Sequence, residues 1–226
     1  MCIRDSYRDE GFSSEALLNY LVRLGWSKGD QEIFSLEEMI DGFDLSGINK
    51  ASAKFDIEKL RWVNQQHLFN TNDDELILMI KAQSETAIGL NDETMKKFIN
   101  AYKNRAHTIN DLVFSCDSLF SDKINYDEAS AEKFLKKEII SPLEDVVDSL
   151  RESDWNQESI SEALKSVCEK HEIGFGKIGQ PIRIAVTGGS QSPSIDQTLI
   201  LLDQQTVVDR IDAAIEYIKE NSNEET

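Results

Sequence analysis

The chain has 226 residues, a formal net charge of −18 and 40% hydrophobic residues, as expected of a globular protein with a buried core. No stretch approaches the roughly 18 consecutive apolar residues of a membrane helix, and the first residues lack the apolar core of a signal peptide. The cysteines Cys2, Cys116 and Cys168 form no CxxC pair, which argues against a zinc site or a disulfide framework and favours the cytoplasm.

Apolar residues recur at helical spacing along most of the chain, and a residue with a capping side chain precedes each apolar run. Ser35 and Glu38 form a capping-box pattern, and Ser141 followed by Pro142 predicts another helix start. The helix starts predicted in chain order are Ser13, Ser35, Asp56, Asn72, Asn91, Thr108, Asp127, Ser141, Asn156, Ser192 and Thr206. The sequence therefore predicts an all-α protein.

The glycine-rich residues 174–189 are expected to interrupt the helical pattern. Within them, residues 182–186 are the one candidate strand, although the same residues can equally form a helix. Polar clusters near Thr71 and at residues 153–154 predict boundaries between three small helical domains.

An acidic chain is a poor partner for nucleic acid on average, but binding depends on where the charges lie. Three stretches contain no acid: residues 59–72, 94–110 and 173–195. The second stretch is the most basic, since it carries Lys96, Lys97, Lys103 and Arg105. Chance clustering of the acids elsewhere explains such gaps equally well on composition alone.

Motifs of enzyme chemistry are missing from the sequence, which has no phosphate-binding P-loop and no HExxH pair. Residues 174–179 match GxGxxG, but they precede Pro181 instead of joining a strand to a helix. We predict neither a catalytic site nor a metal site.

Residues 179–195 are the most informative segment. Arg183 lies in acid-free surroundings and is followed by a glycine turn and by Ser192 and Pro193, which predict the start of a helix. A helix start offers unpaired amides, and arginine can hydrogen-bond or stack on an unstacked base, so the segment suits RNA. The alternative is a tight connection in which Arg183 binds a local carbonyl.

The segment GKIGQPIRIAVTGGSQSPSI, followed by DRIDAAIEYI, resembles the C-terminal signature of glutamyl-tRNA synthetases, GxxxxPLRxAxTGxxxSPxL. Near the other end, YRDEGFSSEALLNYLVRLGW resembles the stretch after that family's KMSKS-type loop. The segment KFDIEKLRWVNQQHL resembles its KLxWxNxxY element. The resemblance runs from residue 7 to residue 218 and is weakest between residues 70 and 172.

The resemblance implies a helical stem-contact domain at residues 7–70, followed by a helical anticodon-binding region, the α-helix cage, in two subdomains at residues 71–153 and 154–226. The full enzyme of this family joins glutamate to tRNA(Glu) with ATP and Mg²⁺ and is expected to be a monomer. Its HIGH and KMSKS motifs are missing here, so the chain itself is expected to have no cofactor and no ligase activity. Residues 1–6 match nothing in the family and are expected to be a non-native extension.

The family's anticodon-binding residues are carried over to this chain by position. Arg183 corresponds to the arginine of the PLR element, and Ser192, Pro193 and Ile195 lie where the family packs around the anticodon bases. Arg105 corresponds to the arginine of the RxxTL element, which favours discrimination against tRNA(Gln) without settling it.

Arg23, Lys59 and Arg61 are the residues expected to contact the tRNA stem. The tryptophans are expected in packing instead of base stacking: Trp26, Trp62 and Trp155. The leading interpretation is an inactive fragment that binds tRNA, and three alternatives to it exist. The first is an acidic helical module that binds another protein and no RNA. A truncated active enzyme is disfavoured by the missing ATP motifs, and a glutaminyl-tRNA synthetase by the absence of a predicted β-barrel.

Overall fold

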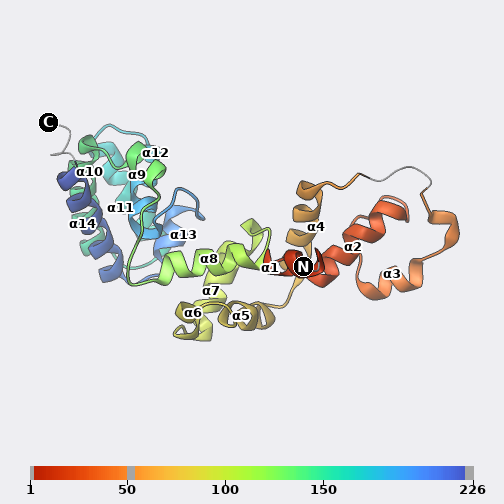
Figure 1. Ribbon diagram of the computed structural model, residues 1–226. Coiled ribbons are helices and arrows are strands. Elements are labelled where there is room, and N and C mark those ends of the chain that lie inside the picture. The colour runs from red at the N-terminus through yellow and green to blue at the C-terminus, as the bar shows by residue number, and fades with distance from the viewer. Residues whose placement is uncertain (1–2, 50–53, 222–226) are drawn as a thin grey trace. The chain divides into compact units, whose positions relative to one another are not determined.

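The computed structural model describes residues 3–49 and 54–221 of the chain (Figure 1). It divides into two compact units, Met1–Phe114 and Ser115–Thr226, which are described separately below. Residues 3–49 and 54–221 form helices and contain no strand, which confirms the predicted fold class. Residues 3–6 of the predicted extension lie in the first helix, and residues 1–2 lie outside the described ranges.

The starts of α2, α3 and α4 in the first unit are those that the sequence predicted, whereas α1 and η1 were not predicted. The Ser13 side chain accepts a hydrogen bond from the Ala16 amide, Ser35 and Glu38 form the expected capping box, and the Asp56 carboxylate caps the helix after it. The elements are α1 (Ile3–Asp9), α2 (Ser14–Gly25), α3 (Leu36–Gly42), η1 (Leu45–Gly47) and α4 (Ile57–Asn70).

Helices α2 and α4 pack together around an apolar core. The core includes Ala16 and Tyr20 from α2 and Leu60 and Val63 from α4. Asn64 joins this core to a distant segment, because its side chain accepts from the Ser13 amide (2.8 Å) and donates to the His107 carbonyl (2.5 Å).

Short helices complete the first unit. Thr108 caps the last of them by accepting from the Asp111 amide (3.3 Å), as predicted. The elements are α5 (Asp73–Lys81), α6 (Glu85–Ile88), α7 (Asp92–Tyr102), η2 (Lys103–Arg105) and α8 (Ile109–Phe120), whose last residues belong to the second unit. Helices α5 and α7 pack together through fully buried residues that include Ile80, Met95 and Phe98.

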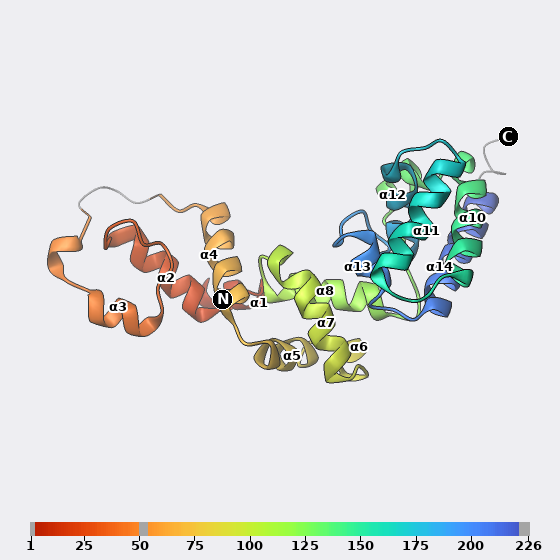
Figure 2. The same cartoon turned by 180° about the vertical axis from the view of Figure 1, so that it is seen from behind.

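The second unit is a cluster of helices in which α10 packs against both α11 and α14 (Figure 2). Helix α12 packs against α9, α11 and α14, with Ile178, Ile182 and Ala185 fully buried. The elements are α9 (Glu128–Phe134), η3 (Lys137–Ile139), α10 (Ile140–Glu152), α11 (Gln157–Lys170), α12 (Phe175–Thr187), α13 (Ile195–Leu199) and α14 (Gln204–Asn221).

Two predictions about the glycine-rich segment were wrong. Residues 175–187 form α12 without interruption, because burial of its apolar face outweighs the low helix propensity of its glycines and Pro181. Ser192 does not begin a helix, since α13 begins at Ile195 and the Ser192 hydroxyl bonds elsewhere.

The predicted cap at Ser141 was also wrong. Helix α10 begins one residue earlier, at Ile140, directly after η3, and its start carries no side-chain cap. Pro142 therefore lies in the first turn, where its missing amide costs no helical hydrogen bond. The buried Cys116 and Cys168 are free thiols. The described helices include none long and apolar enough to cross a membrane.

Replacing Gly188 with alanine is expected to destabilise the second unit by about 2 kcal/mol or more. Gly188 ends α12 with φ +77°, and an added Cβ would collide with the Asn125 carbonyl oxygen. The Gly188 carbonyl accepts a hydrogen bond from the Asp127 amide (2.8 Å), so the collision also strains that hydrogen bond. Urea unfolding of Gly188→Ala, followed by circular dichroism, measures the loss.

The adjacent Gly189→Ala is the matched control, because an added Cβ there would meet nothing within 4 Å. We expect it to change the free energy of unfolding by less than about 0.5 kcal/mol. Equal stability of the two variants would contradict the role assigned to Gly188.

Candidate nucleic-acid interface

The loop between α12 and α13 is fixed by Arg183. Its Nη1 donates to the Ser190 carbonyl oxygen (3.3 Å) and its Nη2 to the Pro193 carbonyl oxygen (3.1 Å). The structure thus has the local carbonyl contacts that the alternative interpretation of Arg183 expected. Such contacts hold the loop in one conformation, because a planar guanidinium fixes the positions of both acceptors.

The predicted site residues of this loop are mostly buried. Ser192 is 9% exposed and Ile195 is 2% exposed, and Pro193 is buried as well. The Ser192 hydroxyl is 3.1 Å from the Pro193 carbonyl and 3.1 Å from the Thr198 hydroxyl, so it takes part in a buried network. These buried residues stabilise the conformation of the loop by packing and hydrogen bonding inside it.

Gln191 and Ser194 are the exposed residues on either side of this buried pair, and the sequence did not single them out. Their pattern gave no signal, because both are ordinary polar loop residues. What distinguishes them is their position beside the buried Ser192 and Pro193, which only the folded loop defines.

Arg105 ends η2 in the first unit and is exposed. It forms no hydrogen bond or ion pair with any residue in the described ranges. The neighbouring Lys103 is different, since its Nζ donates to the Thr71 carbonyl (2.8 Å) and to the Asp73 carboxylate (2.8 Å). Arg105 lies in the first unit and Arg183 in the second.

The acid-free stretch 94–110 is not acid-free in space. Lys96 pairs with Asp74 (2.9 Å), and Lys97 pairs with Glu93 (2.8 Å). The hydrogen bond that Lys96 donates to the Asp74 carboxylate raises the pKa of Lys96. With Lys103 paired as well, Arg105 is the cation of this stretch that has no ion pair within the described residues.

Two of the residues expected to contact a tRNA stem, Arg23 and Lys59, lie around Glu32, whereas Arg61 pairs with Glu58 (3.9 Å). The carboxylate of Glu32 pairs with Arg23 (3.1 Å) and Lys59 (3.2 Å), and the hydrogen bond from Arg23 is the largest cause of its lowered pKa. The Arg23 side chain is only 19% exposed, whereas Lys59 is 40% exposed and Arg61 is 52% exposed.

The three tryptophans differ in their surroundings. Trp26 is buried in the first unit, and the Trp155 indole donates to the Leu202 carbonyl (2.8 Å), so both pack as expected. Trp62 is exposed, and the Lys59 Nζ lies 4.0 Å from its ring centroid. Trp62 therefore does not lie in the core of this unit, and its packing against another domain stays a prediction. Its ring lies beside the Lys59 ammonium group on α4.

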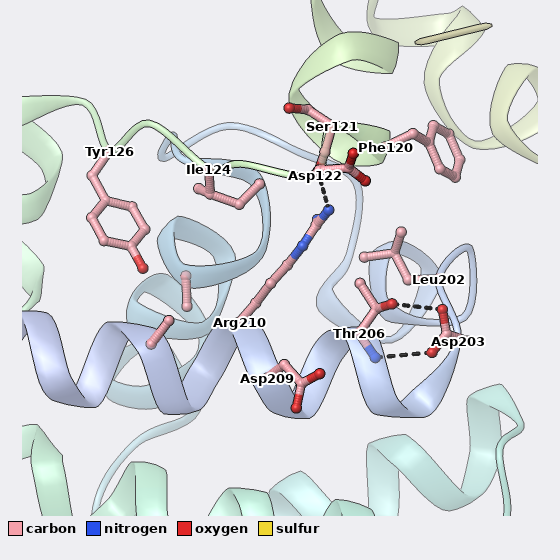
Figure 3. A pocket seen from close by; sticks show the side chains of 12 residues that line it. Phe120, Ser121, Asp122, Ile124, Tyr126, Leu202, Asp203, Thr206, Asp209 and Arg210 are labelled. Atoms are coloured by element: carbon pink, nitrogen blue, oxygen red, sulfur yellow. Dashed lines mark hydrogen bonds between the residues drawn. The ribbon is translucent and has the colours of Figure 1, made fainter. Parts of the chain in front are cut away.

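Arg210 is a half-buried residue that connects three segments of the second unit and that the sequence did not single out. It extends from α14 beside a cavity of about 480 Å³ (Figure 3). Its Nη1 donates to the carbonyls of Leu119 and Val186, and its Nη2 to that of Ser121, each at 2.7 Å. Burial lowers the pKa of Arg210, but an arginine stays charged at neutral pH.

The cavity itself does not suit an anion. Asp122, Asp203 and Asp209 line it, and the Arg210 guanidinium already holds three carbonyl oxygens. A weak signal in the sequence was an arginine between the apolar residues Val208 and Ile211 of a helix. The described residues also include no group of three or more His, Cys, Asp or Glu side chains that could hold a metal ion.

Arg210→Met is expected to destabilise the second unit by about 3 kcal/mol, because three carbonyls lose a charged donor at once. Urea unfolding measures the change. Arg151→Met is the control, since Arg151 is 52% exposed and pairs with Asp212 at the surface (3.0 Å). We expect the control to cost less than about 1 kcal/mol. Similar losses in both variants would refute a special role for Arg210.

Comparisons with known proteins place these features in a family. The family model described as the anticodon binding domain matches residues 70–215. The model for the catalytic domain of class I tRNA synthetases (E and Q) matches residues 1–62.

Two solved structures resemble the chain. A glutamate tRNA ligase from Elizabethkingia meningosepticum CCUG26117, in complex with its amino acid, is 29% identical with a TM-score of 0.80 over 94% of this chain and 43% of that one. A glutamate-tRNA synthetase from Elizabethkingia anophelis is 30% identical with a TM-score of 0.75 over 93% and 42%. The chain spans less than half the length of either protein. The chain belongs to the glutamate–tRNA ligase family of class I aminoacyl-tRNA synthetases and corresponds to its helical C-terminal part.

Proposed function

We propose that the chain binds tRNA(Glu) and recognises its anticodon as the C-terminal half of a longer glutamate–tRNA ligase. The observation that carries the proposal is the loop held by Arg183, which falls inside the residues that match an anticodon binding domain. A fixed loop suits base recognition, because the ordering entropy is lost on folding and not on binding.

In this proposal Arg105 contacts an anticodon base directly. Its guanidinium is exposed and has no competing acid among the described residues, so its donors can form two parallel hydrogen bonds to a base edge. Arg183 acts on the anticodon by holding the loop between α12 and α13 in place and through the part of its own side chain that lies at this loop.

The exposed side chains of Gln191 and Ser194 meet the anticodon bases, whereas Ser192, Pro193 and Ile195 set the shape of the loop that carries them. An amide and a hydroxyl can each donate and accept hydrogen bonds, which suits the edges of splayed bases. The residues at the family positions thus support the loop, and their exposed neighbours contact the bases.

The first part of the chain contacts the tRNA stem through α4. Arg61 is exposed, and the half-buried Lys59 lies beside the Trp62 ring. The mostly buried Arg23 positions Lys59 through the shared Glu32. We propose the predicted domains as functional parts: residues 7–70 for the stem, and residues 71–153 and 154–226 for the anticodon.

The chemistry belongs to the full-length enzyme. There, ATP with Mg²⁺ activates glutamate, and the chain described here orients the tRNA. We propose that this enzyme is a cytoplasmic monomer. No step of the proposal uses a metal ion held by residues 3–49 or 54–221.

An acidic helical module that binds another protein is the second candidate. It is favoured by the exposed apolar side chains on α3 and η1, such as Ile40 (67% exposed) and Leu45 (79% exposed). This candidate requires no contribution from Arg105 or Arg183, which separates it from tRNA binding.

Arg105→Gln is expected to weaken the binding of the whole chain to a tRNA(Glu) transcript by about 1–3 kcal/mol, the scale of a lost bidentate base contact. Fluorescence anisotropy measures the affinity for the cognate transcript and for one with an exchanged anticodon. Only the cognate complex should weaken, because the lost contact reads a base and not the backbone.

Arg151→Gln serves as the control, since Arg151 is exposed in the second unit and makes only surface ion pairs. If wild-type protein binds neither transcript, the protein-binding module becomes the better account. If Arg105→Gln and Arg151→Gln weaken both transcripts alike, the effect is one of overall charge and the assignment of Arg105 fails.

A further inference from the structure

Three lysines of the second unit line a single cavity. Lys133, Lys136 and Lys177 are exposed, and none forms an ion pair with a residue in the described ranges. In a chain of net charge −18, several other lysines are held by acids, as Lys96 is by Asp74 and Lys103 is by Asp73. We call these three residues the lysine cluster.

The lysine cluster lines a cavity of about 510 Å³. Lys133 comes from α9, Lys136 directly precedes η3, and Lys177 comes from the first turn of α12. Glu138 is the one acid among the residues that line the cavity. The sequence separates the cations by up to 44 positions, so no single stretch of it revealed the cluster.

Packing beneath the cavity holds these elements together. Both α9 and η3 pack against α12, and the apolar residues between them, Leu135 and Ile139, are buried. Gly174 and Gly176 line the opposite side of the cavity. An added Cβ at either glycine would meet nothing within 4 Å, so the space beside their backbone is open. The cavity is therefore open at the surface and bordered by bare backbone.

We infer that the lysine cluster binds the phosphodiester backbone of RNA. This inference rests on the proposed function and adds a second point of contact to it. Lysine carries a compact charge on a flexible stem, which suits a phosphate oxygen and carries little information about base identity. The cavity lining includes no Arg, Asn or Gln side chain that could read a base edge.

The charges around the cluster favour short-range contact. At physiological salt, charges separated by more than about 8 Å are largely screened, so the distant acids of the chain do not cancel the cluster. All three lysines lie within residues 70–215, the range that matches an anticodon binding domain, which favours RNA over an acidic peptide as the partner.

The test is a salt titration of tRNA(Glu) binding by the whole chain carrying Lys133→Gln, Lys136→Gln and Lys177→Gln together. We expect binding at low salt to weaken about tenfold or more, and the slope of log affinity against log salt to fall by about 2, because each phosphate contact contributes roughly 0.7–0.9. The loss should be equal for the cognate and the anticodon-exchanged transcripts, unlike the loss in Arg105→Gln.

The matched control changes three other exposed lysines of the same unit to glutamine: Lys123, Lys165 and Lys170. It alters the net charge equally and should leave the salt slope near the wild-type value. Circular dichroism should give unchanged melting for both triple variants, because all six side chains are exposed.

Each other outcome overturns the inference in a distinct way. Equal losses in the two triple variants would indicate an effect of net charge alone. If the wild-type protein binds tRNA and the cluster variant shows the same affinity and the same salt slope, the cluster does not contact RNA, and the proposed function still stands. Wild-type protein that binds no RNA, but binds a polyglutamate peptide through the cluster, would overturn both proposals.

Discussion

The second unit depends on one half-buried cation. Arg210 reaches from α14 and donates to the carbonyls of Leu119, Ser121 and Val186, so one guanidinium joins the end of α8, the segment after it and the end of α12. Helix ends leave carbonyls without intrahelical partners, and buried carbonyls require donors. Arginine supplies several donors from one group that stays charged. The end of α12 fixed in this way leads directly to the loop that Arg183 orders.

Pairing of charges determines which cations can meet a polyanion. The chain has far more acids than bases, and many lysines are held by acids from other helices, as Lys96 is by Asp74. A paired lysine gains little from a phosphate, because its carboxylate must first be displaced or left repelling the ligand. Arg105 and the lysine cluster have no such partner within the described residues. A strongly acidic protein can therefore bind RNA mainly through a few unpaired cations, whereas Lys59 and Arg61 must exchange Glu32 and Glu58 for the phosphates of the stem.

Local patterns predicted most of the helices, whereas contacts between distant residues determined the site. The caps at Ser13, Ser35 and Asp56 were correct because a cap depends on residues within one turn. The continuous α12 was missed because its stability comes from burial against other helices, which overrides the propensities of glycine and proline. The acid-free stretches misled for the same reason, since Asp73 and Asp74 approach residues 96–103 only in the fold.

In the loop after α12, the residues that hold the loop in place differ from those proposed to contact the anticodon. A residue whose side chain donates to a backbone carbonyl of the loop, as Arg183 and Ser192 do to Pro193, contributes to binding by keeping neighbouring residues in place. Its replacement then changes the loop as well as any direct contact, so loss of affinity alone does not identify a base-reading residue. Exposed residues without internal partners do not carry this ambiguity, because their replacement leaves the fold intact. Arg105 is consequently the position at which recognition by this chain can be separated from folding.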